Sequence, residues 1–97
     1  MAYSIQFAAA AKRQLLGFPA NEHSGILNAI EVQLSVEPTV ETRNRKRLRH
    51  NPLAPWELRF NKVRVFYDVE EPDTVTILAI GTKRRDRLYI DDEEIQL

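Results

Sequence analysis

The stretch Thr74–Tyr89, TVTILAIGTKRRDRLY, constrains the fold most, because it passes directly from the most apolar run of the chain to the most concentrated cationic one. Its first half is rich in aliphatic and β-branched residues, which favour a buried strand, and Gly81 can break that strand where the backbone must turn or something must approach closely. The cluster that follows contains Lys83, Arg84, Arg85, Arg87 and Tyr89. A buried strand that holds such a cluster at its end predicts a binding site for a polyanion.

Length and composition indicate a small globular protein. The chain has 97 residues and no cysteine, which predicts one domain over residues 1–97 with a modest core and without disulfides or thiolate chemistry. Apolar residues make up 43% and charged residues 29%, a balance that does not suggest disorder. No apolar run approaches the ~20 residues needed to span a bilayer, and the N-terminus lacks the cationic region of a signal peptide. We therefore expect a cytoplasmic protein without a membrane partner.

The charges are unevenly distributed although the net charge is zero. All of the 14 Lys and Arg except Lys12 and Arg13 lie between Arg43 and Arg87, whereas the tail Asp91–Glu94 is wholly acidic. A locally basic surface can bind phosphates on a molecule that is neutral as a whole. The acidic tail is expected either to be solvated or to fold back onto the basic loop.

The hydrophobic pattern of the first third predicts one strand and two helices. Tyr3–Phe7 alternates apolar and polar side chains, as a strand with one buried face does. Ala8–Leu16 and a segment from Asn21 to about Val36 read as helices that pack as an antiparallel hairpin.

The second half predicts three further strands. Trp56–Phe60 and Val63–Glu70 are joined by a turn at Asn61-Lys62, and a turn at residues 71–73 leads into the strand that starts at Thr74. The order is β-α-α-β-β-β. The fold class is therefore α+β, with the helical hairpin packed on a mostly antiparallel four-stranded sheet.

Residues 39–55 are predicted to be one long irregular connection that carries a second basic cluster. Its cations are Arg43, Arg45, Lys46, Arg47 and Arg49, followed by His50. A loop this cationic would repel itself unless an anion or an acidic partner neutralised it. RNA phosphates and an acidic segment of a partner protein are the occupants that we favour jointly, and a solvated loop is the alternative.

The order of four segments resembles a known family over essentially the full chain. Tyr3–Phe7 with its alanine-rich helix is followed by WELRF, by VRVFYDVE, which is similar to a "YRVIYEV" strand, and by VTILAIGTKRRDRLY, which is similar to a "VVxVLxVGHRRxxxY" end. These segments resemble the RelE/ParE superfamily of small bacterial toxins from type II toxin–antitoxin systems. The closing RLYIDDEEIQL is similar to a RelE-like branch with an acidic-apolar tail.

This resemblance implies a ribosome-dependent mRNA endonuclease, an mRNA interferase that inhibits translation and is held inactive in a hetero-oligomer with a cognate antitoxin. Such enzymes use no metal and no cofactor, since the 2′-hydroxyl of the RNA attacks the adjacent phosphate. The positions that match the family's catalytic residues are Arg59, Arg64, Lys83, Arg85 and Tyr89. The cations expected to bind RNA phosphates are Arg43, Arg45, Lys46, Arg47, Arg49, Arg84 and Arg87.

The chain departs from the family pattern at two places. Thr82 stands where many relatives have His, and Glu57 and Arg59 stand where one subgroup has two lysines. Arginine remains protonated and is a poor general base, so the proton acceptor is unassigned. Glu57, Tyr89 and His50 are the candidates.

Several alternatives stay open. Arg64 can equally form a structural ion pair with Asp68, and Trp56 is more often a core residue than a base-stacking platform. A ParE-like inhibitor of DNA gyrase and a toxin-fold protein without activity remain the competing function classes. If the two basic clusters contact about six phosphates, the affinity for single-stranded RNA should fall with salt with a log–log slope near about −4.

Overall fold

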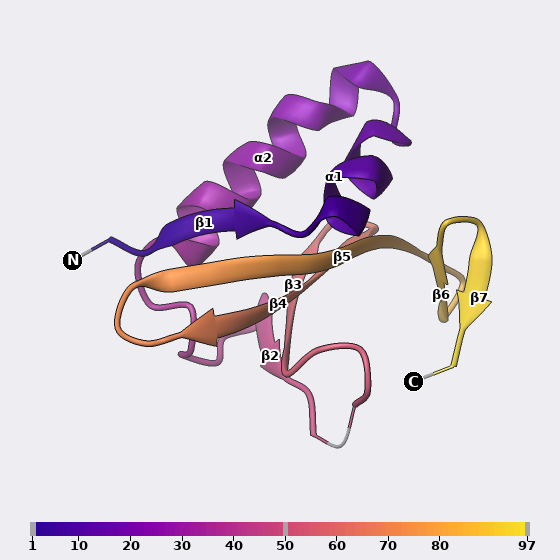
Figure 1. The fold of residues 1–97 in the computed structure, drawn as a ribbon. Coiled ribbons are helices and arrows are strands. Elements are labelled where there is room, and N and C mark those ends of the chain that lie inside the picture. The colour runs from indigo at the N-terminus through magenta and orange to yellow at the C-terminus, as the bar shows by residue number, and fades with distance from the viewer. Residues whose placement is uncertain (1, 50, 97) are drawn as a thin grey trace.

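The structure, a computed structural model, describes residues 2–49 and 51–96. Two helices cover one face of a sheet (Figure 1), so the predicted α+β class is confirmed. The elements are β1 (Ser4–Phe7), α1 (Ala9–Leu16), α2 (Ala20–Leu34), β2 (Arg45–Arg47), β3 (Trp56–Phe60), β4 (Val63–Glu70), β5 (Thr74–Arg84), β6 (Arg87–Ile90) and β7 (Glu93–Ile95). None of the helices in the described part of the chain is long and apolar enough to cross a membrane.

Within the described residues the sheet has seven strands, where the sequence predicted four. Six of them follow the order β2-β3-β4-β5-β6-β7, and β1 pairs in parallel with β5. The added strand β2 lies within the predicted irregular connection, where Lys46 pairs with Glu57 of β3. The added strands β6 and β7 come from the C-terminal tail. Each of the three is only three or four residues long, which is why periodicity did not show them.

β5 continues through Gly81 to Arg84, so of the two roles predicted for this glycine a backbone turn does not occur. The reason for a glycine here is close approach. A Cβ atom at this position would lie 2.6 Å from the carbonyl oxygen of Tyr89 and 2.7 Å from Cγ1 of Ile90. A side chain at residue 81 would therefore displace β6.

The C-terminal tail is folded into hairpins with tight turns. Arg85 (φ 50°) and Asp86 (φ 68°) join β5 to β6, and Asp91 (φ 54°) and Asp92 (φ 64°) join β6 to β7. Two successive residues with positive φ are typical of the hairpin turn whose twist matches that of the strands. Among the described residues, the acidic tail thus pairs with its own neighbouring strand and does not fold back onto the basic loop.

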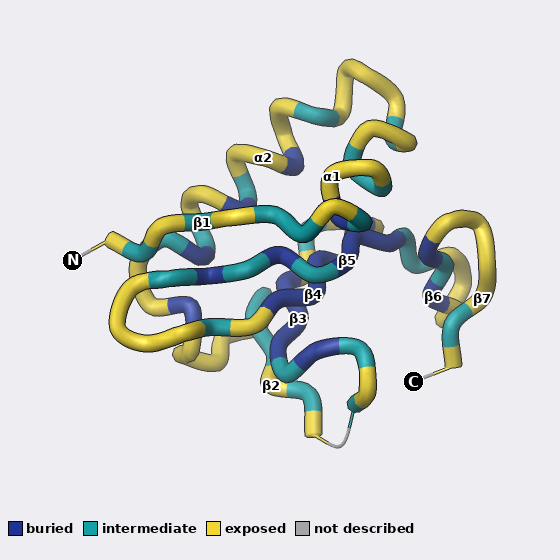
Figure 2. The backbone as a smooth tube through the Cα atoms, in the orientation of Figure 1, coloured by how far each residue is buried: buried dark blue, intermediate teal, exposed yellow. Residues whose placement is uncertain are grey.

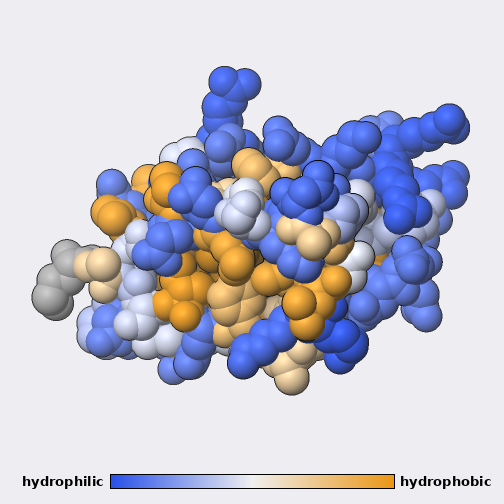
Figure 3. Space-filling view, turned by 90° about the horizontal axis from the view of Figure 1, so that it is seen from above, coloured by the Kyte–Doolittle hydropathy of each residue, from blue (hydrophilic) through white to orange (hydrophobic). Residues whose placement is uncertain are grey.

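Buried residues follow the central strands of the sheet (Figure 2), and their apolar side chains form two cores, one on each face. The larger core lies under the helices, where Ile26, Ile30 and Leu34 of α2 pack against the strands. It includes Trp56, which is 5% exposed, as expected for a core residue. A smaller core on the opposite face surrounds Phe66. From the helix side, apolar surface is visible in the middle of the molecule and is surrounded by hydrophilic side chains (Figure 3).

The edge of β5 is shared by two strands with a gap between them. β1 pairs with β5 as far as Ile77, and β6 pairs with it from Thr82 onward. Gln14 of α1 fills this gap, because its Oε1 accepts a hydrogen bond from the backbone N–H of Ile80 (2.8 Å). Its Nε2 donates to Asp91 of the β6–β7 turn (3.1 Å). The side chain of Gln14 therefore ties the terminal hairpin to the body of the protein.

Candidate functional site

Strand alternation gathers basic side chains on the sheet face opposite the helices, which we call the helix-free face. Trp56 and Leu58 of β3 and Val63 and Val65 of β4 belong to the core under the helices. The residues that alternate with them therefore point to the helix-free face. With Lys46 of β2 and Lys83 of β5, the basic residues of this face are Lys46, Arg59, Arg64 and Lys83, and its acidic residues include Glu57 and Asp68.

Two arginines lie directly opposite each other in the middle of this set. Arg59 and Arg64 are cross-strand partners on β3 and β4, and Arg64 is opposite Gly81 on β5. Side chains at such positions are about 5 Å apart at their Cβ atoms, and like charges there repel each other. Glu57, of which 6% of the side chain is exposed, accepts a hydrogen bond from Nε of Arg59 (2.9 Å). This ion pair offsets part of the repulsion.

The guanidinium of Arg64 is held by the turn that follows β3. Its NH1 donates to the carbonyl oxygens of Asn61 (2.7 Å) and Val63 (3.0 Å). Burial lowers the pKa of Arg64, the nearby Glu57 carboxylate opposes this shift, and the charge of Arg59 adds to it. An anion bound on this face would offset both the cost of burying the charged Arg64 and its repulsion by Arg59. The arrangement is therefore suited to binding a phosphate.

The expected ion pair between Arg64 and Asp68 does not form among the described residues. Asp68 instead accepts a hydrogen bond from the backbone N–H of Val69 (2.8 Å). Lys83 is placed beside the β3–β4 turn, because its backbone N–H donates to the carbonyl oxygen of Lys62 (2.7 Å). Three neighbouring strands thus bring Arg59, Arg64 and Lys83 to one end of the sheet.

A solved structure has the same fold. The chain is 25% identical to one chain of the toxin–antitoxin complex RelBE2 from Mycobacterium tuberculosis, with a TM-score of 0.73. The likeness covers 86% of this chain and 93% of that one. This chain has a RelE-like fold. The resemblance drawn from the sequence is therefore confirmed, while no protein-family model and no curated protein sequence matches the chain.

Within this RelE-like fold, the predicted catalytic residues do not all lie together. Tyr89 on β6 pairs with Thr82, whereas Lys83 pairs with Leu88, so the side chains of Tyr89 and Lys83 point to opposite faces. Arg85 occupies the exposed β5–β6 turn. The helix-free face brings together Arg59, Arg64 and Lys83, but neither Arg85 nor Tyr89.

The cations that the sequence assigned to phosphate binding near the C-terminus are engaged with the acidic tail. Arg84 lies 3.6 Å from Asp92 and its guanidinium is 4.8 Å from the centre of the Tyr89 ring. Arg87 lies 3.2 Å from Glu94. These pairs are exposed to solvent, and exposed pairs contribute little to stability. A polyanion could therefore compete for the same arginines.

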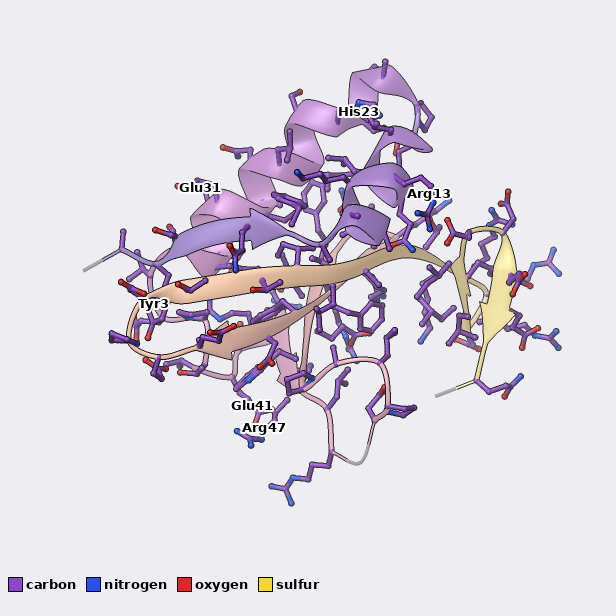
Figure 4. The ribbon with its side chains drawn as sticks, in the orientation of Figure 1. Tyr3, Arg13, His23, Glu31, Glu41 and Arg47 are labelled. Atoms are coloured by element: carbon purple, nitrogen blue, oxygen red, sulfur yellow. The ribbon has the colours of Figure 1, made fainter. Side chains whose placement is uncertain are left out.

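The basic cluster of residues 39–49 is divided between structural and surface roles. Arg45 donates to the backbone of Val40 (2.9 Å) and to both the backbone (2.8 Å) and the side chain (3.0 Å) of Gln33, so it joins β2 to the end of α2. Arg47 lies over the ring of Trp56 at 5.7 Å, and Figure 4 shows it near Glu41, which accepts a hydrogen bond from its backbone N–H (3.4 Å). Arg43 and Arg49 are exposed, and Lys46 alone of this cluster joins the helix-free face.

The three candidate proton acceptors have different surroundings. Glu57 is on the helix-free face but is buried and paired with Arg59. Tyr89 is on the other side of the sheet, and His50 lies outside the described residues. Within residues 2–49 and 51–96, no cluster of three or more His, Asp or Glu side chains could hold a metal ion.

The sequence analysis missed residues that surround Tyr89 on the helix side. Arg13 of α1 points toward the β6–β7 hairpin (Figure 4) and lies 3.5 Å from Asp91. Gln14 fills the gap in the β5 edge, and Lys62 stands at the β3–β4 turn. No local pattern distinguishes these residues from ordinary surface residues, since only the packing of α1 against β5 brings them to the end of the sheet.

Proposed function

We propose that this protein is the toxin of a type II toxin–antitoxin system and acts as a ribosome-dependent mRNA endonuclease. The RelE-like fold, shared with a chain of a toxin–antitoxin complex, supports the toxin assignment. The observation that carries the nuclease assignment is the convergence of Arg59, Arg64 and Lys83 from three adjacent strands on one sheet face. Cations on rigid strands are what a phosphate-cleaving site without a metal requires.

The proposed reaction forms a bond between the 2′-oxygen and phosphorus and breaks the bond between phosphorus and the 5′-oxygen. The 2′-hydroxyl loses its proton to an acceptor, and the leaving 5′-oxygen receives one, so the products end in a cyclic phosphate and a 5′-hydroxyl. Arg64, with its guanidinium held by two backbone carbonyls, is suited to stabilising the charge that develops on the phosphate oxygens. Arg59 and Lys83 would bind the same or a neighbouring phosphate.

The proposed partners follow from the charge of this face. An antitoxin that covers a phosphate-binding surface would present acidic side chains to it, and ribosomal and messenger RNA would bind through their phosphates. These partners act in the cytoplasm, which is where we propose the protein functions.

Replacing Arg64 with alanine tests the nuclease assignment. In a translation reaction in vitro, wild-type protein should produce cuts that appear only on translated message and are mapped by primer extension. Arg64→Ala should reduce the cleavage rate by about 10²-fold or more, the typical effect of removing one group that stabilises the transition state. Lys12→Ala, which removes an exposed cation on α1, is the matched control and should cut like wild type.

Equal cleavage rates for Arg64→Ala and Lys12→Ala would show that the RNA is not cleaved on the helix-free face. Normal translation in the presence of wild-type protein would remove the nuclease assignment altogether. A supercoiling assay with DNA gyrase would then test the ParE-like alternative.

A further inference from the structure

The strands at the borders of the sheet differ in how their outer edges are protected. In β2 (RKR), which is wholly basic, the N–H of Arg45 donates to Oγ1 of Thr42 (3.1 Å). The N–H of Arg47 donates to Oε2 of Glu41 (3.4 Å). β7 (EEI) carries two glutamates. Charged side chains and local hydrogen bonds of this kind keep the edge of a strand from pairing with another chain.

The third border strand, β1, has neither kind of protection (Figure 1). Its sequence, SIQF, contains no charged residue and no proline. The N–H groups of Ser4 (2.7 Å) and Ala8 (2.9 Å) donate toward β5. Because this direction alternates along a strand, the N–H and C=O groups of Ile5 and Phe7 face away from β5. No group in the described part of the chain pairs with them, so the outer edge of β1 is open.

The side chains of β1 suit contact with a second copy of the same strand. Ile5 and Phe7 are half-buried and pack against the core under the helices. Gln6 is exposed on the other side, where it donates to the hydroxyl of Thr76 (3.1 Å). Residues 2–11 carry no charged side chain, so two such edges do not repel each other. A charged strand from another protein would find no opposite charge on β1.

We propose that this protein forms a symmetric dimer in which β1 pairs antiparallel with β1 of a second copy, about a two-fold axis at Gln6. In this register the backbone of Ile5 exchanges both hydrogen bonds with that of Phe7 of the second copy, and the reverse. Every open N–H and C=O group of these two residues is then satisfied. The inference rests on the fold alone and is independent of the proposed function.

The start of α1 supplies a charge complementarity across this axis. The first turn of α1 contains no acidic residue, and Ala8 at its N-cap has no side chain that could cap it, so the positive end of the helix dipole is not neutralised. In the proposed register Tyr3 lies opposite Ala9, the first residue of α1, of the second copy. The hydroxyl of Tyr3 donates to the carboxylate of Glu71 (2.8 Å). Dimerisation therefore brings Glu71 toward the start of that helix, which favours a second copy as the occupant of the edge.

Sedimentation of the full chain over a range of protein concentrations tests the proposal. Wild-type protein should change from monomer to dimer as the concentration rises. Hydrogen exchange at the amides of Ile5 and Phe7 should slow in parallel with dimerisation. Exchange at Ser4 and Ala8, whose N–H groups already donate toward β5, should not change.

Charges introduced at Gln6 test the position of the axis. Gln6→Lys and Gln6→Glu each place two like charges opposite each other and should weaken the dimer severalfold. An equimolar mixture of the two variants should dimerise again, because opposite charges then face each other across the axis. Asn28→Lys and Asn28→Glu, at an exposed position of α2, are the matched controls and should dimerise like wild type, both alone and mixed.

A backbone variant tests the hydrogen bonds themselves. Ile5→Pro removes an N–H that faces away from β5, a position where the edge of a sheet tolerates proline, and it should abolish the dimer. If this variant does not fold, the two Gln6 variants decide alone.

Wild-type protein that stays monomeric at every concentration would overturn the proposal and leave the edge of β1 to a strand of another protein. A dimer that Gln6→Lys, Gln6→Glu and Ile5→Pro all leave unchanged would overturn it by placing the interface elsewhere. The proposed axis is equally wrong if the mixture of the two charged variants dimerises no better than either variant alone.

Discussion

At the scale of single residues, Gln14 stabilises the sheet where strand pairing is missing. The N–H of Ile80 has no strand partner, because β1 ends before it and β6 begins after it, and Oε1 of Gln14 accepts its hydrogen bond. Gln14→Leu keeps the approximate size of the side chain but leaves this partly buried N–H unpaired. The free energy of unfolding should fall by ~1–3 kcal/mol in urea denaturation.

Gln6→Leu is the matched control for this prediction. Gln6 donates to the hydroxyl of Thr76 (3.1 Å) at an exposed site, so its replacement should change the free energy of unfolding by ~0.5 kcal/mol or less. Equal losses for the two variants would show that the gap in the β5 edge is satisfied in some other way, and that Gln14 is an ordinary surface residue.

At the scale of elements, Tyr67 joins β4 to the segment that follows α2. It is fully buried, stacks on Trp56 with ring centres 6.1 Å apart, and its hydroxyl donates to the carbonyl oxygen of Pro38 (2.7 Å). Burial raises the pKa of Tyr67, while the nearby Arg45 opposes this shift. The folded state therefore keeps the phenolic proton at pH values where an unfolded tyrosine, with a pKa of about 10, loses it.

The sign of the pH dependence follows from this difference. Below about pH 10 the contribution of Tyr67 to stability is fully present, and it is lost as the pH rises toward the raised pKa of the folded state. Above about pH 10, wild-type protein should lose ~1.4 kcal/mol of unfolding free energy per pH unit from this one group. Tyr67→Phe should be less stable at neutral pH by ~1 kcal/mol but should show a shallower alkaline slope. Parallel slopes for the two proteins, measured by urea denaturation between neutral and alkaline pH, would contradict the assignment.

Elements also show where sequence reasoning succeeds. The β3–β4 hairpin was predicted because Val63–Glu70 alternates apolar and polar residues, and the same alternation placed Arg64 on the face opposite Val63 and Val65, which belong to the core under the helices. β2 (RKR) has no apolar residue and β7 (EEI) has one, so neither has a hydrophobic pattern to detect. Because the Arg85-Asp86 turn contains no glycine, the sequence did not indicate the β5–β6 hairpin. The position of Tyr89 opposite Thr82 was therefore not predicted.

At the scale of the whole molecule, the net charge of zero would predict no electrostatic attraction to RNA. The uneven arrangement of the charges predicts that such an attraction exists. The sequence suggested about six phosphate contacts, but the fold uses Arg45 to hold α2 and places Arg47 over Trp56. The cations left on the helix-free face are Lys46, Arg59, Arg64 and Lys83. With ~0.7 counterions released per contact, the affinity for single-stranded RNA should fall with salt with a log–log slope of about −3.

Fluorescence anisotropy with a labelled oligouridine at several KCl concentrations measures this slope, and Arg64→Ala should reduce it by ~0.7. Lys12→Ala should leave it unchanged, because that cation lies on α1, away from the helix-free face. A slope near −4 would mean that the arginines paired with Asp92 and Glu94 release their carboxylates when RNA binds. A flat dependence would mean that the basic face recognises a protein, since a protein partner lacks the condensed counterions whose release drives the binding of RNA.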